Sequence, residues 1–276
     1  MRPRDLRLYA HDLALALPAL VVALAFFLVP MVRLALVGAS GEAGWAAYLS
    51  VLTNPRHGQV MLATLALSAA VTLTTLALST AVALTLAPMR FPGRGAVIAG
   101  LTFPLAFPGV VIGFLIILLA GRQGLIGQVT DAVFGEKIVF AYSMLGLFAG
   151  YLYFSIPRVL LTVMAGVETL DPALPEAARS LGAGPWAVFR DVTLPALKPA
   201  LIASGAIAFA TAMGAFGTAF TLATDIDVLP MLIYTEFTLH ANFATAGALA
   251  IVLGLVTWAV LSIARAFGGT SVAAAG

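Results

Sequence analysis

Cysteine is absent from this sequence, and charged residues are scarce at 9% of the 276 residues. Without cysteine there can be no disulfide bond, no thiolate metal site and no cysteine nucleophile. Soluble domains carry about 25% charged residues, so this chain has too little charge to cover a water-facing surface. The formal net charge of +2 gives no reason to expect nucleic-acid binding. With 62% hydrophobic residues, the composition indicates an integral membrane protein.

Six hydrophobic runs are long enough to cross a bilayer, which takes roughly 20 apolar residues. They predict an all-α membrane protein with six spans in a single domain, residues 1–276. The first run exceeds the 7–15-residue core of a signal peptide, so we interpret it as a retained span. The predicted spans cover about residues 13–36, 60–87, 96–120, 138–163, 199–222 and 243–264.

Basic residues are distributed unevenly over the connections between these runs. If the N-terminus is cytoplasmic, ten of the 14 Lys and Arg residues lie inside and four lie outside, with Arg158 counted inside. Cytoplasmic connections carry an excess of Lys and Arg. We therefore predict that both termini are cytoplasmic, as is the connection between the fourth and fifth spans.

Two runs carry features that a substrate pathway would use. The third contains "TFPLAFPG" (102–109), whose prolines bend a helix beside a cavity or a neighbouring helix. The fifth contains "GAIAFATAMGAFGTAF" (205–220), in which bulky side chains recur at spacings of three and four and form one stripe. Helix packing explains the prolines equally well, and a bulky stripe more often packs on another helix or on lipid. The candidate pathway residues are Phe103, Phe107, Phe209, Met213, Phe216 and Phe220.

A polar insert, "LPEAARSLGAGPWAVFRDVTLP" (174–195), separates the fourth and fifth spans. Asp171 followed by Pro172 is typical of a helix start, although Pro175 allows a later one. Gly182 suits the left-handed position after a helix, and Pro185 suits the first turn of a second helix. We predict two short helices joined by a glycine bend, the second ending near the proline that closes the insert.

The residues of the first short helix allow two roles. Ala177 and Ala178 are small enough for the helix to lie in a groove of another protein, with Glu176 and Arg179 at its edge. Alternatively, the insert is a solvated loop in which Glu176 and Arg179 form an ion pair worth about 0.2–0.5 kcal/mol.

The spacing within the insert resembles the coupling loop of ABC importer permeases. The shared pattern is Glu-Ala-Ala, three residues, Gly, nine residues, an aliphatic residue, one residue and Leu-Pro. Val192 stands where isoleucine is common. The resemblance implies the type I importer fold, with cytoplasmic coupling helices between the fourth and fifth spans in a loop of about residues 167–195. It implies that the ATPase is contacted by Glu176, Ala177, Ala178, Arg179, Gly182, Pro185, Leu194 and Pro195.

The same resemblance implies partners and a location. A second permease, expected to be a different chain, completes the pathway, and two cytoplasmic subunits bind ATP and magnesium. An extracytoplasmic binding protein delivers the substrate, and the chain is a multi-pass protein of a bacterial inner membrane. The chain itself has no phosphate-binding loop, because neither Lys137 nor Lys198 follows glycine. We expect it to hold no catalytic residue, metal or cofactor.

The substrate prediction rests on weaker features. Residues 229–253 resemble the polyamine, opine and phosphonate branch of these permeases. The loop before the sixth span is acidic and would attract a polycation, although outside loops are poor in basic residues in any case. We predict a polyamine, spermidine or putrescine, with a phosphonate, ferric iron or thiamine as alternatives. The candidate external residues are Asp225, Asp227, Tyr234 and Glu236.

Two other classes of protein fit less well. Ion-coupled secondary transporters place ionisable residues at mid-membrane, where the predicted spans show none. An intramembrane serine protease needs a serine and a histidine at matched depth, but His240 lies in a loop and no Gly-x-Ser-x-Gly motif is present. The three histidines, His11, His57 and His240, lie far apart in the sequence, so we predict no metal site.

Overall fold

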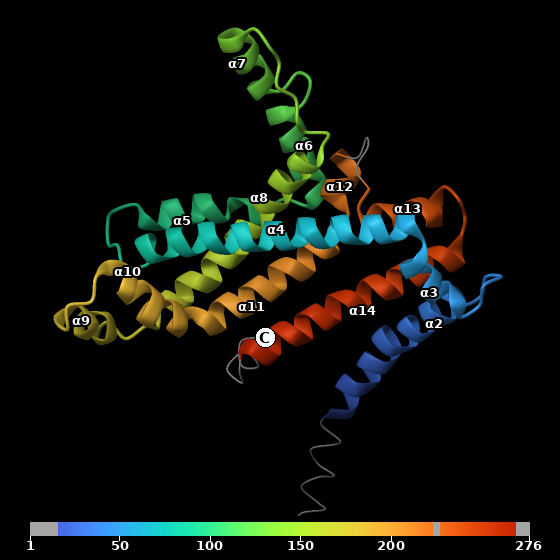
Figure 1. Cartoon of the computed structure of the whole chain (residues 1–276), viewed down its shortest axis with the longest axis horizontal. Helices are drawn as coiled ribbons and strands as arrows, with labels where there is room; N and C mark the ends of the chain where they lie inside the picture. The colour runs from blue at the N-terminus through green and yellow to red at the C-terminus, as the bar shows by residue number, and fades with distance from the viewer. Residues whose placement is uncertain (1–15, 223–226, 269–276) are drawn as a thin grey trace, which may run out of the picture. The chain divides into compact units, whose positions relative to one another are not determined.

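The computed structural model describes residues 16–222 and 227–268, and every regular element in this part of the chain is a helix (Figure 1). The predicted all-α membrane class is confirmed. Both predicted cytoplasmic termini lie outside the described residues, as do residues 13–15 of the first predicted span. Within the described ranges, six helical segments are long and apolar enough to cross a membrane: Ala16–Gly38, Pro55–Leu86, Gly109–Phe134, Met144–Glu168, Pro185–Met213 and Phe243–Ala266.

The chain divides into two compact units, and the first comprises Met1–Gly58 and Ile233–Gly254. Its helices meet at Gly38, where a Cβ atom would lie 2.9 Å from the backbone nitrogen of Ala248. Nearby, the hydroxyl of Tyr48 donates to the carbonyl oxygen of Ala35 at 2.6 Å. The elements of this unit are η1 (Leu24–Leu28), α2 (Val29–Gly38), α3 (Ala46–Thr53) and parts of α13 (Leu229–Thr238) and α14 (Phe243–Gly268).

The second unit comprises Gln59–Leu232 and Leu255–Gly276. Its long helices α4 (Pro55–Leu86), α8 (Met144–Glu168) and α11 (Leu194–Met213) pack side by side (Figure 1). Their contact also carries hydroxyl groups, and Ser79 on α4 donates to the carbonyl oxygen of Ile156 on α8 at 3.3 Å. The buried residues of this contact are Ala83, Leu86, Val159, Leu160, Val163, Met164 and Ala208.

A second cluster of the same unit lies where α6 (Gly109–Ala120) and α12 (Gly217–Leu222) pack against α8. Tyr151 is at its centre, 1% exposed. Glycine allows the close approach: a Cβ atom on Gly150 would lie 2.8 Å from Cγ2 of Thr218. The short helix α7 (Leu125–Phe134) continues from α6.

Two predicted spans are not single helices, and in the third the break falls at the prolines that predicted a bend. The predicted third span, 96–120, is divided into α5 (Arg94–Thr102), the 3-10 turn η2 (Phe103–Ala106) and α6. Pro108 and the residue before it have extended backbones, because a residue that precedes proline is pushed out of the helical region. The predicted fifth span, 199–222, is interrupted between Met213 and Gly217, the residues that end α11 and begin α12.

The helix of the fourth predicted span, α8, begins at Met144, later than the predicted position 138. Residues 140 and 141 instead donate their backbone amides to the carbonyl oxygen of Ala120 at the end of α6, at 3.1 Å each. Helix α8 then starts after Ser143, whose hydroxyl accepts the amide of Gly146 at 3.4 Å. A contact distant in sequence therefore decides this boundary.

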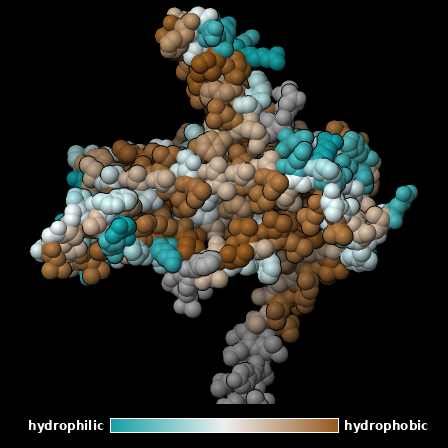
Figure 2. Space-filling model, in the orientation of Figure 1, coloured by the Kyte–Doolittle hydropathy of each residue, from teal (hydrophilic) through white to brown (hydrophobic). Residues whose placement is uncertain are grey.

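Large apolar side chains are exposed along the spans. Leu62 and Leu73 on α4 are each 68% exposed, and Leu118 on α6 is 70% exposed. Figure 2 shows such apolar surface in brown over much of the visible face. Soluble proteins rarely expose apolar patches of this size to water, so these residues face lipid or another membrane chain.

Candidate functional site

The polar insert begins with helix α9 (Ala173–Ser180), which starts after Asp171 and Pro172 as predicted. The Oδ1 atom of Asp171 accepts the backbone amide of Ala173 at 2.9 Å, and Pro175 is accommodated in the first turn. The helix ends at Gly182, whose φ of +85° is the left-handed conformation that glycine adopts without strain. Both ends of the first predicted helix are therefore confirmed.

The second predicted helix differs from expectation at its end. It begins at Pro185 as α10 (Pro185–Val188), but it does not stop near Pro195. The widened turn η3 (Phe189–Thr193) joins it directly to α11, and the amide of Leu194 donates to the carbonyl oxygen of Phe189, five residues earlier. The wider turn shifts the backbone just before Pro195, so the proline ring enters the helix without breaking it.

The surface of the insert is exposed and carries both charge and apolar groups. Glu176 and Arg179 are exposed on α9, and within the described residues no ion pair joins them. The solvated-loop alternative included that pair, but exposed charges fit a solvated loop as well as a docking surface. Leu181 is 89% exposed and Trp186 is 69% exposed. This surface, here called the insert surface, has the mixed character of a docking site.

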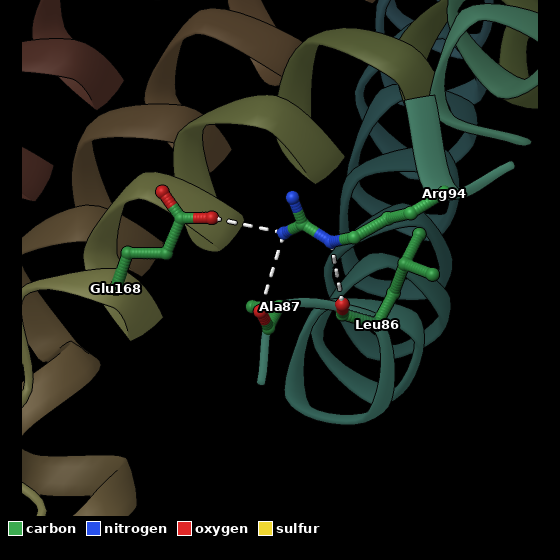
Figure 3. Close-up of polar contacts among 4 residues, drawn as sticks. All are labelled: Leu86, Ala87, Arg94 and Glu168. Atoms are coloured by element: carbon green, nitrogen blue, oxygen red, sulfur yellow. Dashed lines mark hydrogen bonds and ion pairs between the residues drawn. The ribbon is translucent and has the colours of Figure 1, made fainter. Parts of the chain in front are cut away.

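Arg94 ties the start of the insert to the rest of the second unit. Its guanidinium donates to the carbonyl oxygens of Leu86 and Ala87 at the end of α4, at 3.2 Å each. Its Nη2 atom lies 3.0 Å from Oε1 of Glu168, the last residue of α8 (Figure 3). The base of the insert is thus joined to α4 as well as to α8.

A cavity of about 510 Å³ lies where the third and fifth spans break. Non-helical backbone at membrane depth is tolerated only where it is buried in protein or lines a water-filled cavity, and residues of both breaks line this cavity. Residues of both breaks and of α8 line it together, and the hydroxyl of Thr218 donates to the carbonyl oxygen of Gly109 at 2.9 Å; the single ionisable residue among the lining residues is Arg158. The volume is in the range of small-molecule sites.

Arg158 lies well inside α8. Ten residues separate it from Glu168 at the end of the helix, a rise of about 15 Å, or half of the hydrocarbon thickness. Its Nη1 atom lies 3.5 Å from the hydroxyl oxygen of Thr211 on α11. That hydroxyl donates to the carbonyl oxygen of Ile207 at 2.7 Å, so towards Arg158 it acts as an acceptor.

From the sequence, Arg158 was counted among the cytoplasmic charges and assigned to no site. The expectation of no ionisable residue at mid-membrane is wrong for this position. The signal was present, because Arg158 interrupts a run that is otherwise uncharged. Without it, the basic residues still favour a cytoplasmic N-terminus by nine to four.

The six candidate pathway residues lie in different surroundings. Phe107 lines the cavity, and its ring meets that of Phe103 edge-on with centroids 4.9 Å apart. Phe209 instead lines a separate apolar groove beside α4 and α14, and Met213 is fully buried. The break between α11 and α12 interrupts the predicted stripe, and beyond it the rings of Phe216 and Phe220 pack at a tilt with centroids 5.3 Å apart.

The structure describes three of the four candidate external residues. Asp225 lies outside the described residues. Asp227 is exposed in the second unit, whereas Tyr234 and Glu236 belong to the first unit, on α13. The carboxylate of Glu236 lies 3.2 Å from Nδ1 of His240. Among the residues described, no three His, Cys, Asp or Glu side chains form a group that could hold a metal ion.

Comparison with protein families gives one match over most of the chain. The model described as "Binding-protein-dependent transport system inner membrane component" matches residues 80–270. The molybdenum transport system permease protein ModB of Escherichia coli (strain K12) is 33% identical over 189 residues, which cover 67% of this chain and 81% of ModB.

Two further relatives match over more of the chain. The sulfate transport system permease protein CysT of Salmonella typhimurium is 32% identical over 241 residues, covering 85% of this chain and 86% of CysT. The putative 2-aminoethylphosphonate transport system permease protein PhnU of Salmonella typhimurium is 30% identical over 257 residues, covering 91% of this chain and 90% of PhnU.

A solved structure shares the fold. The crystal structure of a bacterial alginate ABC transporter in complex with an alginate pentasaccharide-bound periplasmic protein contains a chain that superposes with a TM-score of 0.76. The two chains are 19% identical, and the match covers 98% of this chain and 96% of the other. At that identity, the similarity supports the fold of the spans and not a substrate.

Proposed function

This chain belongs to the family of binding-protein-dependent transport system inner membrane components, and we propose that it forms half of a substrate pathway driven through its insert. It is a permease subunit of an ABC importer and a multi-pass protein of a bacterial inner membrane. It works with a substrate-binding protein. It is not itself an ATPase, since the ATP-hydrolysing activity lies in partner subunits.

The insert surface is the proposed contact with two cytoplasmic ATPase subunits, which bind ATP and magnesium. The observation that carries this proposal is the exposed helix α9 with Glu176 and Arg179 free of each other. Its ends are fixed by Asp171 and Gly182, so it can transmit a displacement without unfolding. Helix α10 continues through η3 into α11 as one helical segment, Pro185–Met213. A displacement of the insert would therefore move α11 directly.

The cavity at the two helix breaks is the proposed part of the pathway within this chain. A second permease subunit, expected to be a different chain, would supply the facing wall. Of the candidate pathway residues, Phe107 has the direct support of lining this cavity. Phe209 and Met213 are better explained by packing, because they lie in the apolar groove and in the core.

The substrate we favour is a small oxyanion or phosphonate. The relatives are named for molybdenum, sulfate and 2-aminoethylphosphonate transport, and none of the three is named for a polyamine. The polyamine prediction rested on the resemblance of residues 229–253 and on acidic residues before the sixth span, of which Asp225 lies outside the described residues. It stays the competing prediction, and ferric iron and thiamine have no support from these relatives.

Reconstitution of the importer tests the coupling role. The chain is assembled with its partner permease, ATPase subunits and binding protein in proteoliposomes, with either Glu176→Lys or Glu136→Lys. A reversed charge in a docking surface lowers affinity by about tenfold or more, so Glu176→Lys should abolish ATP-driven uptake. Glu136, an equally exposed acid after α7, is the matched control. Equal uptake by both variants would exclude the insert as the coupling element.

A further inference from the structure

The Arg158–Thr211 pair occupies an unusual position for a charged group in a membrane protein. A charged side chain within a span is strongly disfavoured by lipid, so it faces a water-filled cavity, a partner or an acidic group. Within the described residues Arg158 has no ion-pair partner, and it lines the 510 Å³ cavity between the two helix breaks. We propose that Arg158 is a binding site for an oxyanion in transit. This inference rests on the importer function proposed above.

The donors of Arg158 fit that ligand class. A guanidinium presents five N–H donors in a planar fork that matches the oxygen spacing of sulfate, phosphonate and carboxylate groups. Within the described part of the chain its guanidinium makes one polar contact, with Thr211 at 3.5 Å, which is at the long limit of a hydrogen bond. Most of its donors are therefore available to a ligand in the cavity.

Thr211 is a positioning residue for this site. Its hydroxyl hydrogen is directed to the carbonyl oxygen of Ile207, so its lone pairs face the guanidinium of Arg158. This arrangement turns the guanidinium of Arg158 toward α11, beside the cavity that both residues line. A methyl group in place of the Thr211 hydroxyl would remove the oxygen that orients the guanidinium of Arg158.

The same geometry argues against a polycation. No aspartate or glutamate lines the cavity, so a polyamine entering it would meet a fixed positive charge and no compensating carboxylate. Charges of like sign a few ångströms apart repel each other. Arg158 alone would therefore make this cavity selective for anions.

The absence of cysteine allows a direct test by chemical rescue. Arg158→Cys introduces the single cysteine of this chain. The assembled importer, with cysteine-free partner chains, is treated with 2-aminoethyl methanethiosulfonate, which restores a positive charge, or with the 2-sulfonatoethyl reagent, which adds a negative one. Uptake of radiolabelled sulfate, molybdate and 2-aminoethylphosphonate is measured, with spermidine as the cationic probe.

We expect Arg158→Cys to lower uptake of the transported anion by at least tenfold and the positive reagent to restore it at least fivefold. The negative reagent should restore nothing. Arg158→Lys should raise the KM for uptake several-fold with little change in the maximal rate, since lysine keeps the charge and loses the fork. Thr211→Val should also raise the KM for uptake several-fold with little change in the maximal rate. Thr211→Ser keeps the hydroxyl, so its KM should be close to that of the wild type.

The outcomes separate this inference from the function on which it rests. Uptake of an anion that Arg158→Cys leaves unchanged in an assembled complex overturns the site and keeps the importer. Equal rescue by both reagents also overturns it, because bulk rather than charge would then be restored. Wild-type uptake of spermidine and none of the anions overturns the ligand class. Wild-type uptake that does not depend on ATP would overturn the proposed function itself.

Discussion

Arg94 joins the C-terminal ends of α4 and α8, because its guanidinium contacts the carbonyl oxygens of Leu86 and Ala87 and the carboxylate of Glu168 together. Glu168 lies three residues before Asp171, where the insert begins. Free carbonyl groups at a helix end are stabilised by a cationic donor, so Arg94 serves both as the cap of α4 and as a tie to α8. A force on the insert therefore acts on two spans.

Arg94→Ala should lower the thermal unfolding midpoint of the purified protein in detergent by about 2–6 °C, since it removes three hydrogen bonds worth about 1–2 kcal/mol together. Glu168→Gln should have a smaller effect, about 2 °C or less, because the carboxylate is half-exposed and the two carbonyl contacts remain. Arg90→Ala, at an exposed arginine in the same connection, is the control. Equal losses from Arg90→Ala and Arg94→Ala would contradict the capping role.

Gly182→Val should impair ATP-driven uptake more than Gly182→Asn. A Cβ atom at Gly182 meets nothing within 4 Å, so the effect depends on its φ of +85° and not on space. Valine disfavours this conformation by roughly 1–2 kcal/mol or more, whereas asparagine tolerates it. Uptake and membrane abundance are measured together. If both variants behave alike at equal abundance, the left-handed turn is not needed to hold α9.

Tyr151→Phe should destabilise the second unit by about 1–3 kcal/mol, the expected penalty for a buried carbonyl that loses its donor. The hydroxyl of Tyr151 donates to the carbonyl oxygen of Ala215 at 2.6 Å, inside the break between α11 and α12. Tyr153→Phe, two residues along the same helix at a more exposed tyrosine, is the control. Thermal unfolding that does not distinguish the two would show that another group satisfies Ala215.

Gly113→Ala should loosen the packing of α6 on α12. A Cβ atom at Gly113 would lie 2.5 Å from Cβ of Thr221, closer than any two such carbons approach, so the helices would have to separate. Overpacking of this kind costs about 1–3 kcal/mol. Gly254→Ala, at a helical glycine with open space around it, should be neutral or slightly stabilising. A thermal midpoint for Gly113→Ala equal to that of the wild type would refute the close contact.

The limits of sequence reasoning appear in particular residues. Asp171, Gly182 and Pro185 were assigned correctly because capping and left-handed turns depend on neighbours within a few residues. Pro195 was assigned wrongly as a stop, since the turn η3 that accommodates it is not encoded by one recognisable residue. The start of α8 was also missed, because the amides of residues 140 and 141 bond to Ala120, about 20 residues earlier.

The sequence by itself determined the class of protein, a membrane-embedded importer permease. Its six hydrophobic runs and the residue spacing of its insert are local patterns, formed by residues close together in the chain. Only the tertiary structure decided the candidate transit site. Phe107, Arg158 and Thr211 come from three segments some 50 residues apart, and packing of α8 and α11 around the two helix breaks brings them to one cavity. Such packing depends on side-chain shape across distant segments, so the periodicity of any one run cannot reveal it.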